Sequence, residues 1–176
     1  MTIDMKIVSI AISKHKGTRK QQVEAAELVE NQGLEKDAHA GGWHRQVSFL
    51  ASEQIDGARA QGLDVTFGDF AENIATTGVD WKTVPVGTRV ELGDTAVVEI
   101  TQIGKTCHNK CAIYYQAGDC IMPREGVFAR VIRGGRIECG DTITLQRFPV
   151  PQNGPDQSQQ SVGRTGKARP VEHGNG

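Results

Sequence analysis

The stretch Ala96-Val-Val-Glu-Ile-Thr-Gln-Ile103, which runs directly into Gly104-Lys-Thr-Cys-His-Asn-Lys-Cys111, decides the fold class of this chain. Its first half is rich in β-branched residues and predicts a strand. Residues 126–132, Gly-Val-Phe-Ala-Arg-Val-Ile, predict another. Three of the four cysteines, Cys107, Cys111 and Cys120, therefore lie on a loop between two strands. A thiolate there can ligate a soft metal, carry a sulfur atom or attack an electrophile.

Short strand patterns continue on both sides of this stretch. Residues 6–12 and 23–29 predict two paired strands, and further strands are expected over residues 46–50, 70–74, 88–92 and 142–146. Residues 52–60 predict a short helix, with Ser52 as its N-cap and Gly62 after its end. Many short strands and few helices predict a mainly β fold, specifically a closed or nearly closed β-barrel.

Length and charge exclude several classes of protein. The 176 residues suffice for one domain with a real core, and a net charge of −1 argues against nucleic-acid or membrane-surface partners. No apolar run approaches the roughly 20 residues that cross a bilayer. The first residues lack the pattern of a secretory signal. We therefore expect a cytoplasmic protein with reduced cysteines.

The composition changes sharply near Pro149. Residues 151–176 contain no aromatic residue, leucine or isoleucine. Such a segment buries too little apolar surface to offset the entropy lost on ordering. We predict one domain over residues 1–149 and a disordered tail over residues 150–176.

Cys107 is the main candidate for chemistry. Lys105, His108 and Lys110 are close to it in sequence, and nearby cations favour the thiolate form. The alternative is a small buried residue, although the polar neighbours favour a functional role. A zinc site built from Cys107, His108, Cys111 and Cys120 is a further alternative, but the spacing matches no common zinc motif. The fourth cysteine, Cys139, is expected to pack.

Residues 35–46, Glu-Lys-Asp-Ala-His-Ala-Gly-Gly-Trp-His-Arg-Gln, form a second polar cluster. His39, His44 and Arg45 could together hold an anion, and an arginine can grip phosphate or carboxylate with two hydrogen bonds. The alternative is a solvated loop in which Trp43 plugs one end of the barrel.

Other charged residues stand in apolar surroundings. Glu72 and Asn73 need buried partners, and either a structural or a functional role fits them. Arg124 and Arg130 precede or lie within a strand, where Arg130 must reach a carboxylate such as Glu72 or a bound anion. A basic turn is expected to be a solvated hairpin tip rather than a phosphate clamp; it contains Lys14, Lys16, Arg19 and Lys20.

These segments together resemble the MOSC domain family, named after the C-terminal part of molybdenum-cofactor sulfurases, and especially its small stand-alone bacterial members. The resemblance covers nearly all of residues 5–147. The motifs that carry it are Gly33-Leu-Glu-Lys-Asp-Ala-His39, Gly41-Gly-Trp-His-Arg-Gln-Val-Ser-Phe-Leu50, Gly68-Asp-Phe-Ala-Glu-Asn-Ile74, Pro85-Val-Gly-Thr-Arg89, Gln102-Ile-Gly-Lys-Thr-Cys107 and Gly118-Asp-Cys-Ile-Met-Pro-Arg-Glu-Gly-Val-Phe-Ala-Arg130.

The resemblance implies a barrel of the pyruvate-kinase type and a cysteine that binds the molybdenum of a pterin cofactor or handles sulfur. It points to Cys107, with Cys120 as second choice. Given this resemblance, we expect Arg45, Arg130 and Lys16 to balance the pterin phosphate and His39 and His44 to line the pocket. Further cofactor-binding candidates are Glu72, Asn73 and Arg124. The pyridoxal-phosphate-dependent domain of the sulfurases has no counterpart here, so no pyridoxal phosphate site is expected.

Three functions compete at this point. The favoured one is a molybdenum-cofactor binder or sulfur carrier, with partners in cofactor biosynthesis, a sulfur-donating desulfurase or an acceptor molybdoenzyme. The second is a molybdenum-dependent reductase of N-hydroxylated substrates that takes electrons from a separate donor. The third is a non-catalytic β-domain held by structural zinc.

Overall fold

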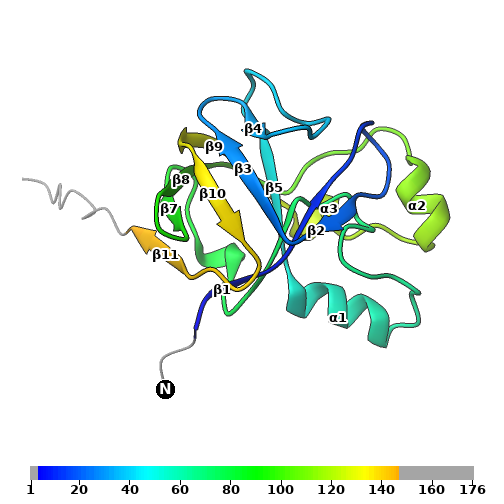
Figure 1. Ribbon diagram of the computed structural model, residues 1–176. Coiled ribbons are helices and arrows are strands. Elements are labelled where there is room, and N and C mark those ends of the chain that lie inside the picture. The colour runs from blue at the N-terminus through cyan, green and yellow to red at the C-terminus, as the bar shows by residue number, and fades with distance from the viewer. Residues whose placement is uncertain (1–3, 147–176) are drawn as a thin grey trace, which may run out of the picture.

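A computed structural model describes residues 4–146 (Figure 1). Three helical segments and one 3₁₀ turn interrupt the strands: α1 (Ser52–Ala60), η1 (Trp81–Thr83), α2 (Ala112–Ala117) and α3 (Met122–Glu125). The strands are β1 (Lys6–Ile12), β2 (Gln21–Val23), β3 (Ala25–Val29), β4 (Gly33–Leu34), β5 (Val47–Ala51), β6 (Ile74–Thr77), β7 (Arg89–Leu92), β8 (Ala96–Ile103), β9 (Val127–Arg133), β10 (Gly135–Glu138) and β11 (Ile143–Gln146).

The strands form two sheets. The larger has the order β11-β7-β8-β9-β5-β6-β1-β2, and the smaller has the order β10-β3-β4. A single bridge between Lys6 and Thr142, together with a 2.9 Å hydrogen bond from Ile7 N to Asp141 O, links β1 to the start of β11. Neither sheet of the described residues closes on itself. The mainly β fold is confirmed, whereas the closed barrel is not.

Strand β5 is buried on both faces, and this places the functional region. Val47 and Phe49 pack into the larger core cluster, whereas Leu50 belongs to a second cluster, because alternate side chains of a strand point to opposite faces. Phe128 of β9 joins this second cluster, which also contains Ile55 and Ala58 of α1, Ile113 and Ala117 of α2, Ile121, and Met122 of α3. Figure 1 shows α1 and α2 on the side of the molecule remote from β7 and β11.

Residues 70–74 do not form the predicted strand, since β6 begins only at Ile74. Ala71 has a positive φ of 63°. The Glu72 carboxylate accepts hydrogen bonds from the backbone N–H groups of Gly68 and Phe70. Local hydrogen bonds of this kind hold a turn in place and compete with strand pairing.

Only Val23 of the expected strand over residues 23–29 belongs to β2, which pairs with β1. Residues 25–29 form β3, which pairs with β10 and β4, so the predicted pairing of this segment with residues 6–12 is wrong. Helix α1 has the predicted bounds, but Ser52 is its first residue and not its N-cap, which is Ala51. Gly62 follows the helix end with a φ of 98°, as expected.

The predicted domain end at residue 149 and the predicted tail over residues 150–176 lie outside the described residues. Within residues 4–146, no helix is long and apolar enough to cross a membrane. The cysteine loop, which we define as residues 104–126, carries two short helices, α2 and α3, that the sequence patterns did not predict.

Candidate functional site

One cavity of about 370 Å³ collects several of the polar residues that the sequence singled out. Strands β5 and β9 contribute Ser48 and Phe128 to its lining, and the turn before β6 contributes Phe70 and Ala71. The cysteine loop supplies the facing wall. The predicted site residues in the lining are His39, Arg45, Cys107, Cys120 and Arg124.

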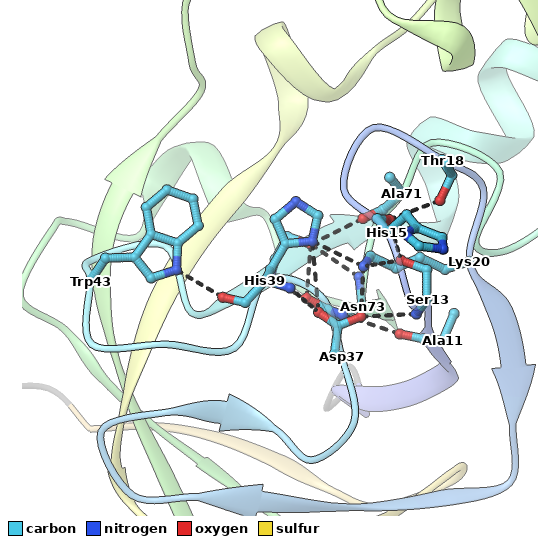
Figure 2. A network of polar contacts seen from close by, with 11 residues as sticks. Ala11, Ser13, His15, Thr18, Lys20, Asp37, His39, Trp43, Ala71 and Asn73 are labelled. Carbon is cyan, nitrogen blue, oxygen red and sulfur yellow. Dashed lines mark hydrogen bonds and ion pairs between the residues drawn. The ribbon is translucent and has the colours of Figure 1, made fainter.

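A buried ion pair stands behind His39 (Figure 2). Lys20 Nζ lies 2.7 Å from Asp37 Oδ1, and both side chains are fully buried. Asp37 also accepts hydrogen bonds from the backbone N–H groups of Ser13 and His39, each at 3.0 Å. Lys20 Nζ lies 3.0 Å from His39 Nδ1 as well. The imidazole in the cavity wall is therefore attached to the interior through one ring nitrogen.

Burial and pairing act against each other in this ion pair. Burial disfavours the charged form of Asp37, but hydrogen bonds from His39, Lys20 and Ser13 outweigh it and hold the pKa of Asp37 below its ordinary value. Burial lowers the pKa of Lys20, and its hydrogen bond and charge interaction with Asp37 offset this only in part. The carboxylate form of Asp37 is thus part of the folded structure.

A glycine allows the basic turn to approach this region. Gly68 has a φ of 88°, and Lys20 N donates a 2.8 Å hydrogen bond to Gly68 O. A Cβ at Gly68 would collide with the Lys20 carbonyl oxygen. Glu72, which accepts from Gly68 N, is itself buried, and desolvation raises its pKa to about 7 despite its backbone hydrogen bonds.

Arg45 lies in the cavity wall and has no carboxylate partner among the described residues, as is also true of Lys105 and Lys110. Its guanidinium carbon lies 4.8 Å from the Trp43 ring centroid and 5.6 Å from that of Phe128. Its Nε is buried and has no hydrogen-bond partner among the described residues. No ion pair is formed by Arg45 within residues 4–146, whereas Arg124 pairs with Asp119 at 3.3 Å. A buried donor without a partner is costly, so this geometry suits an anionic ligand.

Apolar contacts hold the opposite wall. Gly104 directly follows β8 and has a φ of 67°. Its N–H donates a 2.6 Å hydrogen bond to Gly126 O, and this bond closes the base of the cysteine loop. Ile113 and Met122 are 2% and 3% exposed and belong to the cluster around Leu50. The loop is thus anchored by its helices, while the segment of residues 105–111 is free to present polar groups to the cavity.

All four cysteines are free thiols. Cys107 and Cys111 are exposed and line the cavity, and Cys120 lines it from a half-buried position. Burial raises the pKa of Cys120. No group of three or more His, Cys, Asp or Glu side chains among the described residues is arranged to hold a metal ion, so the zinc cluster of Cys107, His108, Cys111 and Cys120 finds no support.

Other predicted site residues lie elsewhere. His44 and Arg130 line a different hollow; His44 Nε2 lies 2.8 Å from Gln102 Oε1. Arg130 pairs with Glu99 at 2.8 Å, so it has the expected carboxylate partner, which is Glu99 and not Glu72. Lys16 Nζ sits 4.5 Å from the Trp43 ring centroid.

Glu72 and Asn73 are buried and have structural partners. The Asn73 side chain accepts from Ser48 N at 3.0 Å and donates to Ala11 O at 3.1 Å, so it joins β5 to β1. The Glu72 carboxylate ties down the turn that contributes Phe70 to the cavity wall. Both residues shape the cavity from behind and are absent from its lining.

Sequence reasoning missed the importance of Lys20 and Asp37. Lys20 was assigned to a solvated hairpin tip, but its side chain is fully buried, so that assignment is wrong for this residue. Lysine is almost never fully buried unless it is paired. The sequence offers no local signal of this pairing, since the two residues are 17 positions apart.

Comparisons with known proteins identify the family of this chain. A family model described as MOSC domain matches residues 36–144, a range that contains His39, Arg45 and the whole cysteine loop. The chain belongs to the MOSC domain family. MOSC domains are commonly linked to proteins that bind the molybdenum cofactor or act as sulfurases. A comparison with curated proteins gave no match.

Solved structures support the same fold. The MOSC chain is similar to the YuaD protein of Bacillus subtilis, with a TM-score of 0.68, 17% identity and coverage of 82% of this chain and 97% of that one. It is also similar to YiiM from Geobacillus stearothermophilus, with a TM-score of 0.63, 24% identity and coverage of 81% and 75%. YiiM from Escherichia coli gives a TM-score of 0.59, 20% identity and coverage of 82% and 71%. At these identities the likeness speaks for the fold alone.

Proposed function

We propose that this MOSC domain binds the molybdenum cofactor and that Cys107 is the thiolate that ligates molybdenum or carries a sulfur atom. The single observation that carries the proposal is the Arg45 guanidinium, which forms no ion pair within residues 4–146 and lies in the wall of the cavity that Cys107 also lines. A soft thiolate and an unpaired guanidinium are the two groups that a metal-bearing, phosphate-bearing ligand requires.

The residues present fit such a group. Cys107 would supply the sulfur ligand, with Cys120 next in order, and Arg45 would hold the phosphate together with Arg124, which is more than half exposed. His39 would donate from the wall behind. When bound, the cofactor supplies a redox-active metal that can bind oxygen or sulfur ligands. The protein's own part is to bind, orient and neutralise an anion.

The sulfur-carrier form of the proposal needs a donor. The Cys107 thiolate would attack the outer sulfur of a persulfide on a desulfurase, the sulfur–sulfur bond of the donor would break, and the donor thiolate would leave. Cys107 is exposed, which gives such a partner access. The sulfur would then pass to the cofactor or to an acceptor molybdoenzyme.

Metal analysis after co-expression with cofactor biosynthesis tests the proposal. We expect molybdenum in the wild type and its loss in Cys107→Ser. Cys139→Ser is the matched control, because its sulfur lies next to Val23 O, outside the cavity lining, and it should keep its metal. The proposal fails if the wild type carries no molybdenum or if Cys107→Ser retains as much as Cys139→Ser.

A reductase of N-hydroxylated bases is the second candidate. The observation in its favour is the apolar part of the cavity wall, where Phe70, Ile113 and Phe128 offer surfaces for a planar heterocycle. Cofactor-loaded protein with an artificial reductant should then reduce hydroxylaminopurine. Silence in this assay, with molybdenum bound, would leave the binder or carrier as the function.

A further inference from the structure

The ammonium group of Lys20 has its donors fully used. It lies 2.7 Å from Asp37 Oδ1, 3.0 Å from Ser13 Oγ and 3.0 Å from His39 Nδ1. The Ser13 hydroxyl donates to His15 O at 3.0 Å, so its oxygen is free to accept from Lys20. An ammonium has three N–H donors and no acceptor. The three donors of an ammonium therefore face three polar atoms, and the role of His39 Nδ1 among them depends on the tautomer of the ring.

The position of the proton follows from the charges. Lys20 Nζ is 2.7 Å from Asp37 Oδ1, whereas His39 Nδ1 is 3.7 Å from Asp37 Oδ2. The carboxylate thus attracts a proton more strongly on Lys20 than on the imidazole. Burial lowers the pKa of Lys20, but the hydrogen bond and the charge of Asp37 act in the opposite direction and favour the proton on the amine. Nδ1 of His39 consequently accepts, and the ring hydrogen must sit on Nε2.

The outer ring nitrogen faces away from this network. Figure 2 shows the second nitrogen of His39 directed away from Lys20 and Asp37. His39 lines the cavity, and no hydrogen bond of its Nε2 occurs among residues 4–146. The ring is fixed further by stacking on Trp43, with centroids 6.4 Å apart and an interplanar angle of 9°. Trp43 Nε1 in turn donates to His39 O at 2.8 Å.

We propose that Lys20 and Asp37 are positioning residues that lock His39 as the Nε2–H tautomer, which makes it a hydrogen-bond donor for an anionic oxygen in the cavity. Arg45 contributes the positive charge of this anion subsite, since its guanidinium lines the cavity and forms no ion pair within residues 4–146. Lys105 and Arg124 also line the cavity, and Glu72 stands behind Lys20. The chemical class of ligand is an oxoanion such as a phosphate group. Only the link between this subsite and a cofactor phosphate rests on the proposed function.

Nuclear magnetic resonance of the ¹⁵N-labelled full chain reads the tautomer directly. Long-range ¹H–¹⁵N correlations distinguish Nδ1–H from Nε2–H for each histidine, and His39→Asn assigns the His39 signals. We expect wild-type His39 to show only the Nε2–H form. The exposed His108 is an internal control and should show a mixture of tautomers. A wild-type His39 with its hydrogen on Nδ1 overturns the proposal.

Lys20→Met then tests the cause. Without the ammonium donor, His39 should lose its single tautomer while His108 keeps its pattern. An unchanged His39 in a folded Lys20→Met shows that Lys20 does not set the tautomer and overturns the positioning role. If Lys20→Met does not fold, the wild-type tautomer still decides whether the outer nitrogen is a donor.

Titration with inorganic phosphate tests the ligand class. Gln can place an amide N–H near the position of Nε2, whereas the shorter Asn cannot reach it. We expect His39→Asn to weaken phosphate binding by about tenfold, the effect of losing one hydrogen bond to a charged group. His39→Gln should retain most of the affinity. Equal affinities for wild type, His39→Asn and His39→Gln, or no phosphate binding by the wild type, overturn the anion subsite. A failure of the molybdenum analysis alone would leave the tautomer result standing.

Discussion

The cavity has two walls that are built in opposite ways. Behind His39, the Lys20–Asp37 pair is fully buried and its polar atoms all have partners. Across the cavity, the cysteine loop is held by apolar anchors such as Ile113, while Cys107 and Cys111 remain exposed. A paired, desolvated wall fixes one donor in place. An apolar-anchored loop leaves its thiols free to react. The contrast suggests a rigid subsite for an anion beside an accessible subsite for a metal or sulfur.

Removing one partner of the buried pair should have the largest effect. Lys20→Met leaves the Asp37 carboxylate buried without its counter-ion, and we expect a loss of about 3 to 5 kcal/mol in the free energy of unfolding. Denaturant unfolding measures it. Lys16→Met is the control, because Lys16 is exposed and forms no ion pair within residues 4–146.

A double variant sharpens the same point. Lys20→Met combined with Asp37→Asn removes both charges, while the amide oxygen can still accept one of the backbone hydrogen bonds that Asp37 accepts from Ser13 and His39. We expect it to be less destabilised than Lys20→Met alone. If the double variant unfolds as easily as the single one, the uncompensated carboxylate is not the source of the loss.

Glu72 should make the free energy of unfolding depend on pH. The unfolded chain releases this proton near the ordinary pKa of glutamate, whereas the folded chain releases it at about 7. The folded state binds more protons between about pH 4.5 and 7, so the Glu72 contribution to stability is present at low pH and is lost as pH rises through this window. The total change is roughly 3 kcal/mol.

The comparison of wild type with Glu72→Gln isolates this contribution. Gln can accept only one of the two backbone hydrogen bonds that Glu72 accepts, from Gly68 and Phe70, so a loss of stability that does not vary with pH is expected as well. The difference in unfolding free energy between the two proteins should change across the window. A difference that stays constant from pH 4.5 to 7 would show that Glu72 is ionised throughout.

The apolar wall should respond to a smaller change in packing. Ile113→Val removes one buried methylene group, and we expect a loss of about 1 kcal/mol. Hydrogen exchange of residues 112–117 should rise with it, because Ile113 anchors α2 to the second core cluster. Val86→Ala is the control on an exposed side chain, with 59% exposure in the wild type, and should change stability by less than about 0.5 kcal/mol. If both variants changed the free energy of unfolding equally, Ile113 would not anchor the cysteine loop.

The exposed thiols of the cysteine loop should react faster than the other two. Of the changes considered, their modification should affect stability least. Cys107 and Cys111 are exposed, whereas burial raises the pKa values of Cys120 and Cys139. Alkylation with iodoacetamide, followed by mass spectrometry, should modify the first two thiols at least about tenfold faster. Faster modification of Cys120 than of Cys107 would move the candidate nucleophile to Cys120.

Much of the local structure could be predicted from the sequence, because alternation and turn residues are local signals. β1, β8 and α1 have the bounds that their patterns predict. Prediction failed at residues 70–74. Their apolar residues have the pattern of a strand, but the Glu72 carboxylate accepts a hydrogen bond from the Phe70 backbone N–H and holds a turn instead. It also failed for α2 and α3, whose few turns are too short to show helical periodicity.

Residue patterns alone predict a mainly β domain with cysteines on a loop between β8 and β9, and they single out Cys107 and Arg45 for testing. The folded arrangement was needed to show that His39 lines the same cavity as the cysteines, whereas His44 and Arg130 line another hollow. It also showed that Lys20 is buried. Partners such as Lys20 and Asp37 meet because the strands are arranged in a particular order and the pair is removed from water. The residues next to each partner in the sequence reveal neither of these.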